Sequence, residues 1–66
     1  MLNASTVRPE DLRAELARRR ILLYRLAAVI GVSPGRLSSV LNENAPLTPA
    51  LAEKIVAALN EDEGSL

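Results

Sequence analysis

The side chains that could do chemistry in this sequence are carboxylates and arginines, because the chain has no histidine and no cysteine. Their absence removes imidazole acid–base catalysis, imidazole metal ligation, thiolate chemistry and disulfides. The clustered carboxylates, Glu10 with Asp11 and the run from Glu61 to Glu63, are explained as charges at a helix start and as a solvated tail. We therefore expect no catalytic residue, no metal site, no cofactor and no small-molecule ligand.

The arginines offer a different chemistry, which is binding to phosphate. The 66-residue chain has zero net charge, but the charge is divided along it. Six arginines lie between Arg13 and Arg36 with only Glu15 against them, a balance of +5, whereas the part from Leu37 onward has a balance of −4. Clustered arginines suit the phosphates of nucleic acid, and the alternative is that they form ordinary solvated helix faces.

The segment from Leu23 to Asn42 supplies the elements that must position these arginines. Ala27 is small enough for two helices to cross closely, and Gly31, four residues later, suits the left-handed turn that ends a helix. Ser33 then caps a second helix and Pro34 occupies its first position. Apolar residues at helical spacing mark the inward faces, at Leu26, Ile30, Val32, Leu37 and Val40. The pattern predicts two short helices joined by a tight turn.

This pattern resembles the helix-turn-helix of the lambda-repressor-like (Cro/C1-type) DNA-binding family. The similarity rests on Ala27, Gly31 and the five apolar positions, and it covers about Leu12 to Leu59. The resemblance implies an all-α fold, a compact bundle of four short helices, in which the second motif helix, at about 34–41, enters the major groove of double-stranded DNA. The sequence departs from the family at Ile21-Leu22-Leu23, where family members often place a polar capping residue.

Carried over residue by residue, the resemblance implies two sets of DNA contacts. The base-facing set is Pro34, Gly35, Arg36, Ser38 and Ser39. The phosphate-contacting set is Arg20, Tyr24, Arg25, Asn42 and Asn44. Most base-facing side chains are small, so we expect modest sequence preference, and we attribute any strong preference to Arg36 on guanine and to close backbone approach at Gly35.

Two of these assignments have structural alternatives that the sequence leaves open. Tyr24 is the only aromatic residue, so its ring could instead pack on the first helix of the small core. Ser38 and Ser39 could be an ordinary exposed helix face.

The flanking sequence divides the chain into an arm, one domain and a tail. Residues 1–8 lack periodicity and are expected to form a flexible arm, and residues 9–60 form the helix-turn-helix domain. Residues 61–66 are expected to be an acidic tail that ends in Gly64-Ser65-Leu66, which is typical of a linker left by an expression vector.

The domain needs two further helices besides the motif. Pro9 predicts the start of a first helix that runs to about Arg20, with Ala14 and Ala17 permitting close approach of a neighbour. The first motif helix is expected over Ile21–Ile30. A last helix is expected from Pro49 to about Asn60, capped by Thr48, with its apolar stripe closing the core.

The resemblance implies a small transcriptional regulator or repressor that acts by occupying a DNA site. One module of this size buries limited surface, so we expect a homodimer on a palindromic site. The alternative on the same fold is an antitoxin-type protein-interaction module, because residues 41–59 are similar to antitoxins of this superfamily.

Location and origin follow from fewer observations. No apolar run reaches the length of a membrane span and no signal peptide opens the chain, so we expect a cytoplasmic protein with no membrane partner. A natural phage or bacterial regulator and an engineered DNA binder on this scaffold both fit the sequence.

Overall fold

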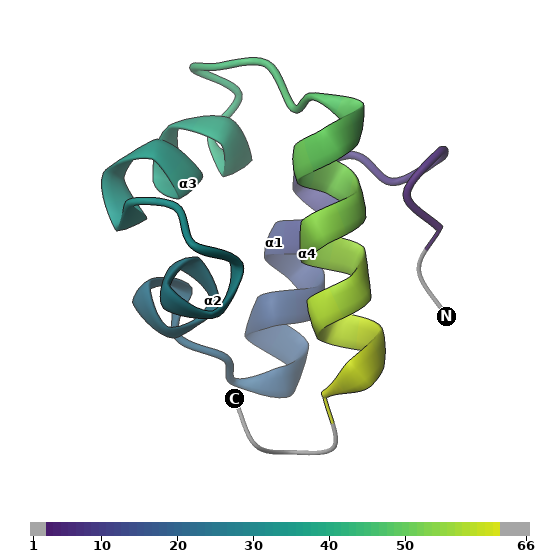
Figure 1. Ribbon diagram of the computed structural model, residues 1–66, viewed down its shortest axis with the longest axis vertical. Coiled ribbons are helices and arrows are strands. Elements are labelled where there is room, and N and C mark those ends of the chain that lie inside the picture. Colours follow the sequence, from purple (N-terminus) through teal and green to yellow (C-terminus); the bar gives the residue numbers. More distant parts are fainter. Residues whose placement is uncertain (1–2, 63–66) are drawn as a thin grey trace.

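Four α-helices surround one apolar interior in the computed structural model, which describes residues 3–62 (Figure 1). The helices are α1 (Pro9–Arg19), α2 (Leu23–Ile30), α3 (Pro34–Leu41) and α4 (Pro49–Glu61). α1 and α4 run in the same direction; α2 packs against α3 and α4, and α3 also packs against α1. The predicted all-α bundle of four short helices is confirmed. Glu63 and the expected vector-derived linker, Gly64-Ser65-Leu66, lie outside the described residues.

The starts of α3 and α4 follow the capping residues of the sequence. The Ser33 hydroxyl accepts a hydrogen bond from the Arg36 N–H at 3.2 Å and begins α3. The Thr48 hydroxyl accepts one from the Leu51 N–H at 3.2 Å and begins α4. Each satisfies a backbone donor that the first helical turn leaves without a partner, which stabilises a helix by about 1 kcal/mol.

The predicted start of the first motif helix at Ile21 is wrong, because α2 begins at Leu23. Leu22 precedes the helix in an extended conformation and offers no side-chain acceptor to it. Ile21 lies in the link between α1 and α2 instead, where its side chain is buried in the core. The apolar residues that the sequence places before α2 therefore serve the core rather than the helix.

The link after α1 is a left-handed turn made without glycine. Arg20 has φ 58° and ψ 38°, and its N–H donates to the Ala17 carbonyl at 3.2 Å. The Ile21 N–H donates to the Leu16 carbonyl at 2.9 Å, which completes the paired bonds of a Schellman motif. An apolar contact typically accompanies this motif, and here Ile21 and Leu16 are both buried members of the core.

α2 and α3 end in left-handed turns as well. Gly31 has φ 78°, and the Ala27 carbonyl accepts from the N–H groups of Gly31 at 2.9 Å and Val32 at 3.0 Å. Glu43 has φ 63° after α3, where the Asn44 N–H donates to the Ser39 carbonyl at 2.8 Å. Only one of the three left-handed residues is the glycine that such turns favour.

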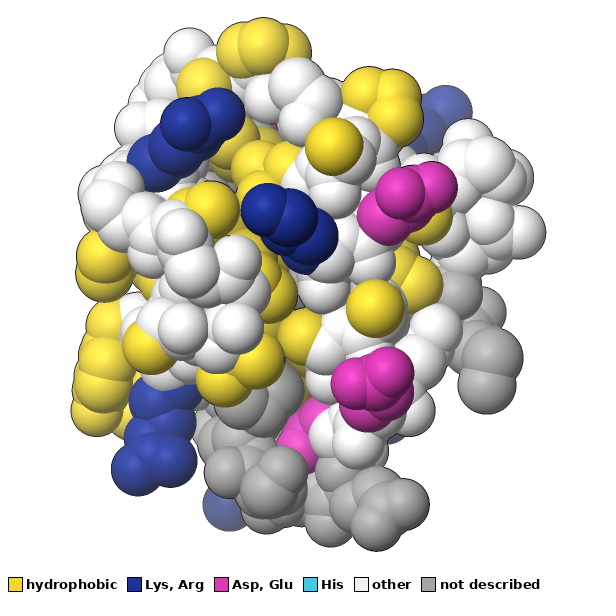
Figure 2. Space-filling view, in the orientation of Figure 1, with side chains coloured by type: hydrophobic (Ala, Val, Ile, Leu, Met, Phe, Trp, Pro, Cys, Tyr) yellow, Lys and Arg dark blue, Asp and Glu magenta, His cyan; other side chains and the backbone are white. Residues whose placement is uncertain are grey.

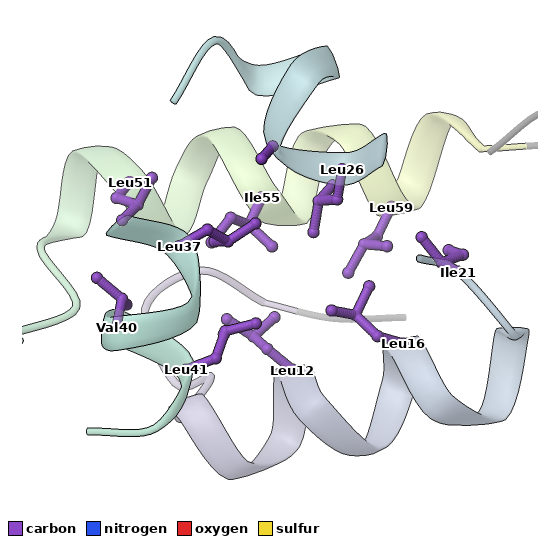
Figure 3. Packing of buried hydrophobic residues seen from close by; sticks show 11 residues of the cluster. Leu12, Leu16, Ile21, Leu26, Leu37, Val40, Leu41, Leu51, Ile55 and Leu59 are labelled. Atoms are coloured by element: carbon purple, nitrogen blue, oxygen red, sulfur yellow. The ribbon is translucent and has the colours of Figure 1, made fainter. Parts of the chain in front are cut away.

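The core lies where the four helices meet (Figure 3). Leu12 and Leu16 of α1 point toward α4, and Leu26 of α2 and Leu37 of α3 enter from the side. The buried members of the cluster are aliphatic: Leu12, Leu16, Ile21, Leu26, Ala27, Leu37, Val40, Leu41, Leu51, Ile55 and Leu59. The expectation of close approach at Ala14 and Ala17 is wrong, since both are exposed: they fall outside the face of α1 that carries Leu12 and Leu16.

The ends of the described chain add little to this core. Residues 3–7 form a turn in which the Val7 N–H donates to the Asn3 carbonyl at 2.9 Å, and Val7 is half-buried against the core. Over residues 3–62, no helix has the length and apolar character needed to cross a bilayer.

Candidate nucleic-acid interface

The turn between α2 and α3 rests on Ala27 and Gly31, the two residues that the sequence assigned to it. Ala27 is completely buried, and its carbonyl accepts both hydrogen bonds that close the turn. Gly31 supplies the positive φ, and a Cβ built on it would meet no heavy atom within 4 Å. Backbone conformation rather than lack of space therefore explains the glycine.

α3 buries one stripe of its surface and presents the rest to solvent. Leu37, Val40 and Leu41 are buried, and the helical period of 3.6 places Gly35, Ser39 and Asn42 opposite them. Of the base-facing set, Pro34, Gly35 and Arg36 are exposed, while Ser38 and Ser39 are half-buried. The five residues therefore lie on one short helix, but only part of the set faces straight outward.

The outward face of α3 carries small side chains, which protrude little from the helix. A Cβ built on Gly35 would meet nothing within 4 Å, so the bare backbone there is open to an approaching molecule. The Asn42 amide donates to the Ser38 hydroxyl at 3.2 Å, one turn earlier along the helix. This bond orients the Asn42 side chain along the helix and leaves its carbonyl oxygen and the Ser38 hydroxyl proton for a ligand.

The arginines divide into paired and unpaired groups. Arg18 and Arg19 both pair with Glu15 across one turn of α1, and Arg8 pairs with Glu10 at 3.5 Å. Within residues 3–62, no side-chain hydrogen bond or ion pair holds Arg13, Arg20, Arg25 or Arg36. Arg20, Arg25 and Arg36, the arginines of the predicted DNA-contacting sets, thus belong to the unpaired group. Arg18 and Arg19 instead form ion pairs within α1.

Glu15 is the carboxylate that pairs with Arg18 and Arg19. The hydrogen bond from Arg18, assisted by that from Arg19, lowers the pKa of Glu15, although partial burial opposes the shift. No carboxylate occurs between Leu16 and Asn42, so α2, α3 and the turn between them carry no negative side chain. In Figure 2, acidic side chains gather over α4, whereas basic side chains lie over α2 and α3 and also at the centre of the view, where α4 carries a lysine between its glutamates. α2 and α3 are therefore purely basic in their charged side chains, whereas α1 and α4 carry both signs.

The phosphate-contacting set is spread over the molecule rather than forming one cluster. Arg20 ends α1 and Asn44 lies in the loop between α3 and α4, and these two places are at opposite ends of the molecule (Figure 1). Tyr24 and Arg25 occupy the first turn of α2, and both are exposed. Tyr24 is 57% exposed, so the alternative in which its ring packs in the core is wrong.

Sequence reasoning overlooked two features of this surface. Glu15 was treated only as a minority charge, although its spacing of three and four residues from Arg18 and Arg19 is that of helical ion pairs. Leu22 precedes α2 and is 53% exposed, so it adds apolar surface at the start of that helix. In the part of the chain that the structure describes, no group of three or more acidic side chains is placed to hold a metal ion.

The comparisons with known proteins add no neighbour to this picture. No family model matches the chain, and neither a curated protein nor a solved structure does so. The geometry and charge of α2 and α3 are therefore the features of this chain that bear on its function.

Proposed function

We propose that this domain binds double-stranded DNA sequence-specifically, with α3 in the major groove, and that it acts as a small transcriptional regulator. The observation that carries the proposal is the division of the arginines. Arg18 and Arg19 are held by Glu15, while Arg20, Arg25 and Arg36 are exposed and belong to a segment, residues 16–42, that contains no carboxylate. Unpaired arginines in a segment without carboxylates match the phosphates of a polyanion.

The profile of α3 suits the shape of the major groove. The groove is about 12 Å wide and admits one α-helix, and small side chains let a helix approach the base edges closely. Gly35 and Ser39 supply that low profile, and Arg36 supplies a guanidinium that matches guanine. The Ser38–Asn42 pair offers a donor and an acceptor with a fixed orientation. Direct readout would therefore come chiefly from Arg36, with the Ser38 hydroxyl beside it and Asn42 contacting phosphate.

Phosphate contacts would set the position of α3 in the groove. Tyr24 and Arg25 on α2, Arg20 after α1 and Asn44 after α3 carry groups that can donate to phosphate oxygens. These few contacts from a small domain would give modest affinity. Two copies on a palindrome, with centres about 34–36 Å apart, would raise it.

Selection from randomised duplex DNA at moderate salt, followed by sequencing of the bound fraction, tests the proposal directly. An enriched motif is the expected result, and a palindromic motif would identify a dimeric complex. Affinity for the enriched duplex should fall steeply with salt, because each phosphate contact releases counterions. If no sequence is enriched by the folded domain, α3 does not read bases, and a tight, salt-insensitive protein partner would instead favour the antitoxin-type alternative.

Arg36→Ala and Arg13→Ala form a matched pair for this test. Both remove one exposed, unpaired arginine and leave the core intact, but Arg36 lies on α3 and Arg13 on α1. Arg36→Ala should weaken binding to the enriched duplex by about 1–3 kcal/mol and relax the preference at one base pair. Arg13→Ala should change affinity little. Equal affinities of Arg36→Ala and the wild type would remove Arg36 from the interface.

A further inference from the structure

A second surface, on the side of α4 that faces away from the core, carries apolar and charged residues that the proposed DNA contacts do not use. A shallow groove runs between the C-terminal end of α2 and the C-terminal half of α4. Val29 and Ile30 line it from α2, and Lys54, Ala57, Ala58 and Glu61 line it from α4. We refer to these six residues as the α2–α4 groove.

The groove exposes apolar surface that the monomer leaves uncovered. Val29 is 59% exposed, the largest exposure among the large apolar side chains of residues 3–62. Ala57 is exposed and Ala58 half-buried, and alanine allows the backbone of another helix to approach closely. Burial of Val29 and the two alanines against a partner would therefore bring an apolar gain without requiring the core to change.

The charges of the groove are arranged so that a second copy of the same surface complements it. Lys54 and Glu61 are seven residues apart, about 10 Å along the axis of α4, with the two alanines between them. Neither residue makes an ion pair within the described part of the chain. In an antiparallel pair of α4 helices centred between Ala57 and Ala58, Lys54 lies opposite the partner's Glu61, and the symmetry repeats the contact.

From this arrangement we infer that the chain forms a homodimer through the α2–α4 groove, with the two α4 helices antiparallel. The interface is isologous, because each copy contributes the same residues and each Lys54–Glu61 contact occurs twice. The alanines set the close approach, Val29 supplies apolar surface, and the two charge pairs fix the register. The surface is small, so the dimer is weak and depends on concentration. The inference holds without DNA and does not rest on the proposed function.

Charge reversal and exchange test the register. In sedimentation equilibrium of the full chain without DNA, the wild type should show a monomer–dimer equilibrium at concentrations up to about 1 mM. Lys54→Glu or Glu61→Lys places like charges at both contacts and should weaken the dimer at least about tenfold. The double variant Lys54→Glu/Glu61→Lys restores opposite charges and should regain most of the affinity. Glu53→Lys reverses a charge elsewhere on the exposed surface of α4 and serves as the control.

Each outcome decides a part of the inference. A wild type that stays monomeric over the whole range overturns the dimer, and single variants that associate as strongly as the wild type overturn the surface. Single variants that dissociate without recovery in the double variant overturn the antiparallel register. Val29→Ser provides a test without charge: it should also weaken the dimer, while circular dichroism should show unchanged helix content because the side chain is exposed.

Discussion

The guanidinium of Arg19 on α1 donates a hydrogen bond of 2.6 Å to the main-chain carbonyl oxygen of Leu59 on α4. The same side chain pairs with Glu15 one turn earlier on its own helix. Because α1 and α4 run in the same direction, the negative ends of both helix dipoles lie at the same end of the bundle. Arg19 therefore joins two helix C-termini that would otherwise repel each other, which gives the arginine-rich end of α1 a role in the fold.

Replacement of Arg19 should destabilise the domain more than replacement of its neighbour. Arg19→Met keeps most of the apolar stem but removes the bond to Leu59, and it should lower the free energy of unfolding by about 1.5–3 kcal/mol. Arg18→Met removes the same charge from the same helical turn, but its side chain is 68% exposed. That control should cost less than about 1 kcal/mol. Urea unfolding of the two variants measures the difference, and equal losses would show that the Leu59 bond contributes nothing.

The decrease in the free energy of unfolding at acid pH should depend on Glu15. The hydrogen bonds from Arg18 and then Arg19 hold the pKa of Glu15 below its ordinary value of 4.5. A pKa that is lower in the folded state stabilises the fold fully above the unfolded-state pKa, and this contribution is lost as the pH falls through the folded-state pKa. The stability difference between the wild type and Glu15→Gln should therefore be constant near neutral pH and shrink below about pH 4.5.

The partner variant Arg18→Met checks the cause of that pH dependence. Loss of the larger hydrogen bond should raise the pKa of Glu15 toward its ordinary value and move the acid loss of stability to higher pH. Chemical unfolding between pH 2 and 7, or direct titration of the Glu15 carboxylate by NMR, measures the shift. A Glu15 titration that stays the same after removal of Arg18 would contradict the assigned cause.

Much of the fold was predictable because local signals and the apolar pattern agree. Ser33, Thr48 and the prolines that follow them place two helix starts, and the spacing of the leucines places the core. The link at Arg20 was not predictable in the same way, because nothing in an arginine side chain signals a left-handed residue. Its conformation follows from burial of Ile21 beside Leu16, which is a tertiary effect.

Less of the candidate interface could be derived from the sequence. Charge division along the chain predicted a basic side of the molecule, and the periodicity of α3 predicted its outward face. Sequence alone could not decide whether Tyr24 is buried or exposed, since an aromatic side chain suits both places. Nor could it tell that Arg19 reaches Leu59, because that contact depends on how α1 and α4 are aligned.

The two glycines of the helix pair should respond oppositely to alanine. Gly31 has φ 78°, where an L side chain is strained, and we expect Gly31→Ala to cost about 1 kcal/mol and Gly31→Val more. Gly35 is the second residue of α3 and a Cβ there would meet nothing within 4 Å, so Gly35→Ala should raise stability by at most about 0.5–1 kcal/mol, the value for a helix interior. Thermal unfolding of both variants measures the contrast. An unchanged melting temperature for Gly31→Val would show that the turn does not need this glycine.

Arg20 should show stability and DNA affinity moving in opposite directions. Its φ of 58° is unfavourable for any residue with a Cβ, so Arg20→Gly should stabilise the domain by about 0.5–1 kcal/mol. The same change removes an unpaired guanidinium and should weaken DNA binding and reduce the salt dependence by about one phosphate contact.

Glu43→Gly is the matched control for Arg20, because Glu43 holds the corresponding left-handed position after α3 with φ 63°. It should stabilise the domain to a similar extent, but it removes a negative charge and should leave DNA affinity unchanged or raise it. Thermal unfolding and titration of a fluorescent duplex measure the two properties in each variant. If Arg20→Gly and Glu43→Gly alter affinity alike, Arg20 makes no phosphate contact, and its left-handed conformation reflects only the packing of Ile21 against Leu16.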